Sequence, residues 1–186
     1  MNTPHPSRRL CLLSGLVCAV GPLWAQTPHA TWRESVAELQ TRGTHHLRYW
    51  GLSIYHAELQ VAAGFEPTQF AKHRLALTLR YSRDFEGSAL AKSTWDEMQG
   101  LMTRSGQRWT PSQSAAWVTQ LNALMPNVQR GDRLGAVNIP GHRVVLFHNE
   151  MPLGMVEDRG FADGFFGIWL SPLSSQPAMR QALLSL

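Results

Sequence analysis

The sequence predicts an α+β fold in which helices gather on one face of an antiparallel sheet. Two observations carry this prediction. Stretches with the period-2 alternation of strands are followed by stretches with helical spacing, and this order then repeats. The later strand stretches are separated by tight turns at 140–141 and 149–152, which is typical of an antiparallel meander. Strands, helices, strands and helices in this order indicate an α+β domain.

The first 25 residues have the composition of a secretory signal. Arg8 and Arg9 lie in a short polar region, an apolar run covers 10–24, and Leu23-Trp24-Ala25 is an acceptable cleavage site. The run is too short to favour a membrane span. We therefore expect a periplasmic or secreted protein that starts near Gln26 and has no stable membrane span after cleavage. Ordinary secretion and twin-arginine export both remain open.

The composition of the remaining chain narrows its class. Residues 26–186 fit a single domain, and 44% hydrophobic residues in the whole chain suffice for one core. Both cysteines, Cys11 and Cys18, lie in the predicted signal, so the exported chain has no disulfide and no thiol chemistry. Without Arg8 and Arg9 it carries 15 basic and 13 acidic residues, a net charge of +2, which does not indicate nucleic-acid binding.

The stretch 47–61 is the longest strand-favouring run, and we expect it to form one strand. Its second half alternates cleanly, but in the first half Trp50, Leu52 and Ile54 share a side with Arg48. This reversal predicts either a bulge near Ile54 or cover on both faces. A covered arginine must reach water, a carboxylate or an anionic ligand, because its guanidinium stays charged.

The other elements follow from their periodicity and from capping and turn residues. Residues 31–40 have helical spacing or form an extended lead-in, and 70–73 lead into a strand at 74–81 with Tyr81 on its leucine face. Gly106 ends one helix, and Thr110-Pro111 starts another. The expected elements after that first hairpin are helices at 84–104 and 110–126, strands at 133–139, 142–148 and 153–156, and helices at 161–170 and 176–186.

Two groups of residues have both a structural and a functional interpretation. Arg48 either extends to solvent or pairs with Glu58, or it forms an anion clamp with the Tyr55 hydroxyl in an apolar cavity. Phe161, Phe165, Phe166 and Trp169 form one apolar helix face, which either packs in the core or lines a cavity. The sequence alone leaves both alternatives open.

Several kinds of catalytic or metal site are not supported by the sequence. His45 and His46 point to opposite faces of a strand, and no His-x-x-x-His pattern is present, so we expect no metal. There is no Gly-x-Ser-x-Gly elbow and no glycine-rich phosphate loop, so we expect no cofactor and name no catalytic residue. Glu157 and Asp158 are expected to cap the following helix.

Four stretches taken together resemble the bacterial exported chalcone isomerase-like proteins. They cover most of the predicted mature chain in order, and they read Arg48-Tyr49-Trp50-Gly51-Leu52-Ser53-Ile54-Tyr55, Arg80-Tyr81-Ser82-Arg83-Asp84, Gly131-Asp132-Arg133-Leu134, and Phe165-Phe166-Gly167-Ile168-Trp169-Leu170-Ser171-Pro172 with Pro177 and Arg180. The resemblance implies an open-faced β-sandwich, a large antiparallel sheet covered on one side by helices. It also implies that Arg48 corresponds to the arginine that holds a charged ligand oxygen, with Tyr55 as its partner in fatty-acid-binding members.

The resemblance also has departures that bear on activity. The plant enzymes carry Tyr-x-x-Lys-x-x-x-Asn, and this pattern is absent here. We therefore expect a non-enzymatic envelope protein that binds a small apolar anion such as a fatty acid. The expected ligand-binding residues are Arg48, Trp50, Leu52, Tyr55, Tyr81, Phe165, Phe166 and Trp169. The alternatives are an isomerase or lyase acting on an enolisable or conjugated carbonyl compound, and a partner-binding envelope protein without a ligand, whose protein partner the sequence does not identify.

Overall fold

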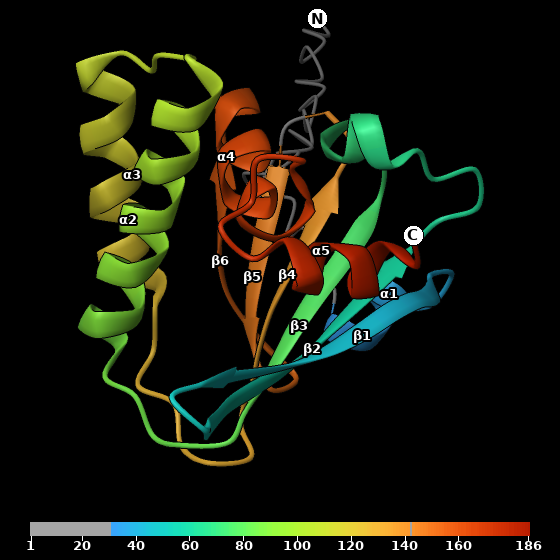
Figure 1. Ribbon diagram of the computed structural model, residues 1–186. Coiled ribbons are helices and arrows are strands. Elements are labelled where there is room, and N and C mark those ends of the chain that lie inside the picture. The colour runs from blue at the N-terminus through green and yellow to red at the C-terminus, as the bar shows by residue number, and fades with distance from the viewer. Residues whose placement is uncertain (1–30, 142) are drawn as a thin grey trace, which may run out of the picture.

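A six-stranded antiparallel sheet forms the centre of the molecule. The computed structural model describes residues 31–141 and 143–186, so the predicted secretory signal lies outside the described residues. Each strand pairs with the next one along the chain, which gives the order β1-β2-β3-β4-β5-β6 (Figure 1). The strands are β1 Gln40–Tyr49, β2 Leu52–Val61, β3 Leu75–Tyr81, β4 Arg133–Ile139, β5 Arg143–His148 and β6 Met151–Glu157.

The long helices cover one face of this sheet, as the sequence predicts (Figure 1). They are α2 Gly87–Ser105, α3 Pro111–Leu124, α4 Arg159–Leu170 and α5 Pro177–Leu184. The short helix α1, Trp32–Val36, packs on the opposite face, where the Trp32 ring meets the Phe147 ring at a centroid distance of 5.2 Å. We call the two sides the covered face and the open face. No helix in the described ranges is long and apolar enough to cross a membrane.

The prediction of one continuous strand over 47–61 is wrong, because a hairpin turn interrupts it. Trp50 and Gly51 have φ values of 51° and 75°, and they connect β1 to β2 as a two-residue loop. Such tight loops require positive φ at both positions. The turn lies inside a run of strand-favouring residues, so composition does not reveal it. The expected bulge is confirmed at Ile54, since Leu47 pairs with Tyr55 while Arg48 pairs with Ser53.

The predicted ends of the helices agree closely with the structure. Thr110 caps α3 through a capping box with Gln113, and Gly106 ends α2 with φ of 69°. Asp158 caps α4 by accepting a hydrogen bond from the Gly160 N–H. One local expectation is wrong: residues 67–72 form a 3-10 helix, η1 (Pro67–Lys72), where the sequence suggested that 70–73 lead directly into a strand. Pro67 at the start of η1 favours the helical φ.

Alternation along β2 and β3 distributes two sets of side chains between the two faces. Leu59 and Leu77 lie opposite each other and belong to the main core between the sheet and the helices. Three residues away along the same strands, His56 and Arg80 also lie opposite each other, but they are exposed on the open face. A smaller apolar cluster around Trp32 covers part of the open face near β4 and β5. The β1–β2–β3 end of that face is left exposed to solvent.

Candidate binding cavity

A cavity of about 400 Å³ lies between the covered face and helices α2, α4 and α5. The strands contribute mainly leucine and tyrosine side chains, α2 contributes mostly small and polar ones from the edge of its packed face, and α4 contributes aromatic ones. Most of its lining is apolar, which is typical of sites for small apolar molecules. The residues that line it are Leu47, Ile54, Tyr55, Leu77, Leu79, Tyr81, Phe85, Ala89, Leu90, Ser93, Thr94, Glu97, Met125, Leu134, Gly135, Ala136, Leu146, Phe165, Ile168, Trp169, Ser175, Gln176 and Met179.

A group of neutral polar atoms projects into this apolar lining. The Trp169 indole N–H donates a hydrogen bond of 3.2 Å to the Tyr55 hydroxyl, which donates to the Met179 sulfur at 3.8 Å. The Tyr55 and Tyr81 rings meet edge to face with centroids 5.9 Å apart. Among the described residues, the Tyr81 hydroxyl has no hydrogen-bond partner. A sulfur atom is a weak acceptor, so both phenol O–H groups are available to a ligand.

Both phenols stay protonated across the physiological pH range. Burial raises the pKa of Tyr55 to about 12, although the hydrogen bond from Trp169 acts in the opposite direction. Burial, together with the neighbouring Tyr55, also raises the pKa of Tyr81 well above its ordinary value. An O–H group that does not ionise remains a donor. The cavity therefore presents two O–H donors to an oxygen acceptor of a ligand, and the Trp169 N–H holds the Tyr55 hydroxyl in place.

The charges around the cavity are unlike those expected for an anion clamp. Among the described lining residues, Glu97 is the only carboxylate, and there is no lysine, arginine or histidine. Glu97 accepts a hydrogen bond of 2.8 Å from the Ser175 hydroxyl. Ser93, Thr94 and Gln176 add further polar groups, so the polar part of the lining comes largely from α2 and from the segment before α5.

The structure brings together four of the eight predicted ligand-binding residues. Tyr55, Tyr81, Phe165 and Trp169 line the cavity. Phe166 points elsewhere in the same core and has no exposed surface, so for this residue the core-packing alternative holds.

The other three predicted residues, Arg48, Trp50 and Leu52, lie outside the cavity at the exposed end of the β1–β2 hairpin. Trp50 and Leu52 are 86% and 52% exposed. Arg48 follows the cavity residue Leu47 on β1, so alternation places its side chain on the open face. The clamp expectation assumed that Arg48 and Tyr55 share one strand, and the turn at 50–51 separates them onto two strands.

The sequence reasoning missed the contribution of α2. Ser93, Thr94 and Glu97 line the cavity, although each is polar and lies next to the apolar stripe of an amphipathic helix. Their small or flexible side chains beside Leu90 are the signal that could have indicated a gap in the packing. Met179 on α5 was likewise missed, because a methionine in a helix is usually an ordinary core residue. In the structure its side chain is 1% exposed.

Comparisons with known proteins agree with this architecture. A family model described as chalcone isomerase-like matches residues 50–185. An uncharacterized protein of Haemophilus influenzae is 26% identical over 110 residues, which are 59% of this chain and 51% of that protein, so the chain spans about half the length of this curated relative. The crystal structure of a fatty-acid binding protein of Arabidopsis thaliana has a TM-score of 0.59 at 10% identity, covering 79% of this chain and 87% of that one. At this identity the structural likeness shows the fold alone.

Proposed function

This chain belongs to the chalcone isomerase-like family, and we propose that it is a non-enzymatic binding protein that holds a small apolar molecule such as a fatty acid in the cavity. The observation that carries the proposal is an apolar space of about 400 Å³ with neutral donors in its wall. The volume lies in the range of small-molecule sites. The structural similarity to a protein named for fatty-acid binding supports the same ligand class.

The polar end of the ligand is proposed to lie at Tyr55, Tyr81 and Trp169. A carboxylate or carbonyl oxygen accepts hydrogen bonds, and the two phenols are donors that keep their protons, while the Trp169 N–H holds the Tyr55 hydroxyl. Hydrogen bonds to an ionised acceptor are stronger than neutral ones, which favours an acid over an alcohol. Glu97 opposes an anion, since its charge contributes to the raised pKa of Tyr55. The anionic nature of the ligand is therefore the finer part of the proposal.

An isomerase is the less well supported function. An isomerase would need a cation to stabilise an oxyanion, and Arg48 is the residue that the family resemblance implies for that role. Arg48 is exposed on β1, and none of the described lining residues is a cation. Binding without turnover needs only the cavity and its donors. Together with the apolar run at 10–24, which favours export, this supports a carrier or sensor in the bacterial envelope.

The proposal is tested by native mass spectrometry and by solvent extraction of protein purified without detergent. Titration with a fluorescent fatty acid then measures affinity. Thr94 lines the cavity and is half-buried, so Thr94→Trp directs an indole into the cavity and is expected to abolish binding. Gln99→Trp is the matched control, because Gln99 is exposed on the same helix and outside the lining. Equal binding by the Thr94→Trp protein would show that the ligand does not occupy the cavity.

Two further variants locate the polar end of the ligand. Removal of one or two hydrogen bonds in Tyr55→Phe and Trp169→Phe should weaken fatty-acid binding by roughly threefold to tenfold each. Arg48→Ala should leave affinity unchanged, whereas a loss there would move the carboxylate to the hairpin. A fatty alcohol of equal length should bind more weakly than the acid. If it binds equally well, the ligand is neutral, and only the anionic part of the proposal fails.

A further inference from the structure

The end of the β1–β2 hairpin exposes a cluster of large apolar side chains. Tyr49, Trp50 and Leu52 are 65%, 86% and 52% exposed, and together with Gly51 they make up what we call the hairpin tip. The Tyr49 and Trp50 rings touch edge to face, 6.2 Å apart between centroids. Among the described residues, Tyr49 is the only aromatic residue whose ring contacts the Trp50 ring. Exposed apolar clusters of this kind are typical of interaction sites.

The backbone at the tip favours a different residue from the one present. Trp50 has φ of 51°, in the left-handed region that is unfavourable for a bulky side chain. Asn-Gly is the preferred pair for a two-residue loop in which both φ values are positive. With Trp-Gly the fold accepts local strain and gains no burial, because the indole is in solvent. Strain without a structural gain points to a function for the indole outside the fold.

A row of basic side chains crosses the open face beside the tip. His46 pairs with His56, His56 with Arg80, and Arg80 with Arg133, so directly opposite positions on β1, β2, β3 and β4 form what we call the basic row. Like charges at opposite positions destabilise a sheet. Arg133 is neutralised by Glu150. In the part of the chain that the structure describes, Arg80 forms no ion pair.

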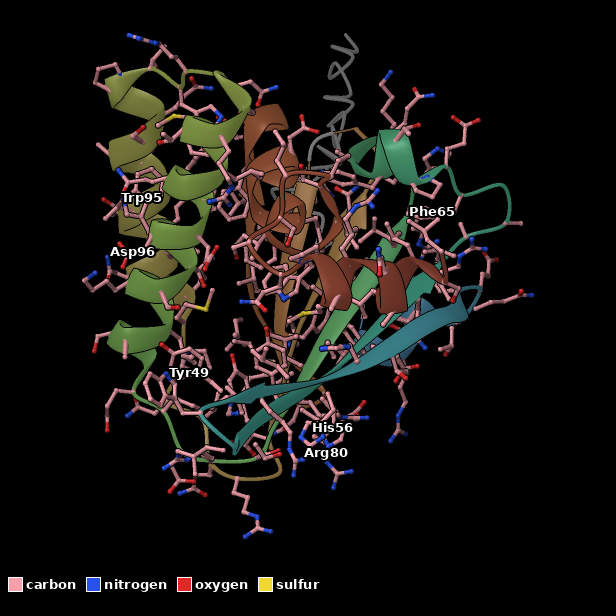
Figure 2. The ribbon with its side chains drawn as sticks, in the orientation of Figure 1. Tyr49, His56, Phe65, Arg80, Trp95 and Asp96 are labelled. Carbon is pink, nitrogen blue, oxygen red and sulfur yellow. The ribbon has the colours of Figure 1, made fainter. Side chains whose placement is uncertain are left out.

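A hollow between the basic row and the hairpin tip is lined by further arginines. Leu52 at the tip, His56 and Arg80 line it together with Arg83 and Arg130 from the neighbouring loops. Arg83 and Arg130 are exposed, and neither forms an ion pair within the described residues. In Figure 2, Tyr49 lies near the turn of the hairpin, and His56 and Arg80 lie together further along it. Leu52 therefore joins the apolar hairpin tip to these cationic groups, whereas Tyr49 faces the covered side.

We propose that this surface docks the protein on a bilayer that carries anionic lipids. Tryptophan and tyrosine side chains favour the membrane interface, where the ring is in an apolar layer and its polar atom meets water. Arginines beside them attract lipid phosphates through charge. Leu47 and Ile54 on the same hairpin line the cavity, so docking brings a part of the cavity wall that is two residues from the hairpin tip close to the bilayer. The docking surface does not depend on which molecule the cavity holds.

The proposal is tested by co-sedimentation with vesicles of phosphatidylcholine alone and with added phosphatidylglycerol. The full chain is expressed in a Gram-negative bacterium, and the processed form is used once mass spectrometry has identified its first residue, so that the apolar run at 10–24 does not contribute. We expect binding to the anionic vesicles that weakens as salt rises. Equal binding to both vesicle types, or none to the anionic ones, would overturn the proposal.

Variants separate docking from folding. Trp50→Asn creates the Asn-Gly turn, so thermal stability should stay equal or rise while vesicle binding falls about tenfold or more. Leu52→Ser gives a second, milder loss without a change at the strained position. Arg80→Gln should weaken binding roughly fivefold. Arg108→Gln is the matched control, because it removes the same charge from the exposed connection between α2 and α3.

Two other occupants of the surface would each overturn the proposal in a recognisable way. If inorganic phosphate abolishes vesicle binding at a concentration too low to act by ionic strength, the hollow is a soluble-anion site. If the parent dimerises in gel filtration and Trp50→Asn does not, the hairpin tip contacts a second copy of the chain.

Discussion

The two faces of strands β2 and β3 are built from alternating residues of the same segments, yet they have opposite chemistry. On the covered face, Tyr55 and Tyr81 lie opposite each other and are directed at an apolar cavity. One residue along, His56 and Arg80 lie opposite each other in solvent. The difference shows how one sheet can line an apolar cavity on one side and carry charged side chains on the other. Each face can then be altered without the other, and the following predictions use this independence.

The largest contrast is expected between two aromatic truncations. Phe166 has no exposed surface in the core of the covered side, so Phe166→Ala should lower the free energy of unfolding by about 3–5 kcal/mol. Tyr49 is 65% exposed at the hairpin tip, and Tyr49→Ala should cost less than about 1 kcal/mol. Urea unfolding followed by circular dichroism measures both. Similar losses in the two variants would contradict the division into a packed and an exposed face.

A polar group on the covered face should come next in size. The Asn138 side chain is 1% exposed, and its amide donates to the carbonyls of Ala71 and His73 at 2.8 Å each. Asn138→Ala removes both bonds and leaves the two carbonyls without these donors, which should cost about 1–3 kcal/mol. Gln60→Ala on the open face is the control and should change stability by less than about 0.5 kcal/mol. Equal effects would mean that Asn138 does not hold η1 to the sheet.

The phenols of the covered face should make the fold sensitive to alkali. In the unfolded chain a tyrosine ionises near pH 10, whereas the pKa of Tyr55 is raised to about 12 in the fold. The folded state therefore keeps its proton longer, and stability falls as pH rises through this window. Between pH 9 and pH 11 the loss from Tyr55 is on the order of 1 kcal/mol. Tyr55→Phe should show a smaller loss in urea unfolding at the two pH values, and an equal loss would count against buried phenols.

The smallest effect is expected from a histidine on the open side. Desolvation and the positive charges of His56, Arg48 and His45 lower the pKa of His46 below its ordinary value of 6.5. The unfolded chain then takes up a proton first, so stability falls as pH drops below about 6.5. His46→Gln should reduce this acid sensitivity. In an NMR titration, Arg48→Ala should move the pKa of His46 toward its ordinary value, and no movement would place the Arg48 charge away from the histidine.

Local features of the fold could be read from the sequence with good accuracy. The strand Arg133–Ile139 has the predicted bounds, and Gly106 and Thr110 mark helix ends as expected. The resemblance to chalcone isomerase-like proteins is confirmed by the family match over 50–185. These predictions succeed because capping, turn chemistry and alternation depend on residues close together in the chain.

The candidate site was predicted less completely than the fold, and Arg48 illustrates why. Placing Arg48 in the site required its strand and its side of the sheet, and a turn of two residues changed both. The tyrosines could be found because each lies on the same face of its strand as leucines or alanines two and four residues away. The polar residues of α2 could not, because a helix face is recognised as cavity lining only when the opposite wall is known.

The sequence by itself determined the α+β class and the positions of most helices and strands, and it offered a bulge near Ile54 as one of two explanations for the reversed pattern. The tertiary structure alone decided that Tyr55, Tyr81 and Trp169 meet in one cavity and that the cations gather outside it on the open face. The physical reason is range. Backbone preferences act within a few residues, whereas a cavity forms where segments more than a hundred residues apart, such as Tyr55 and Trp169, fail to fill the space between them.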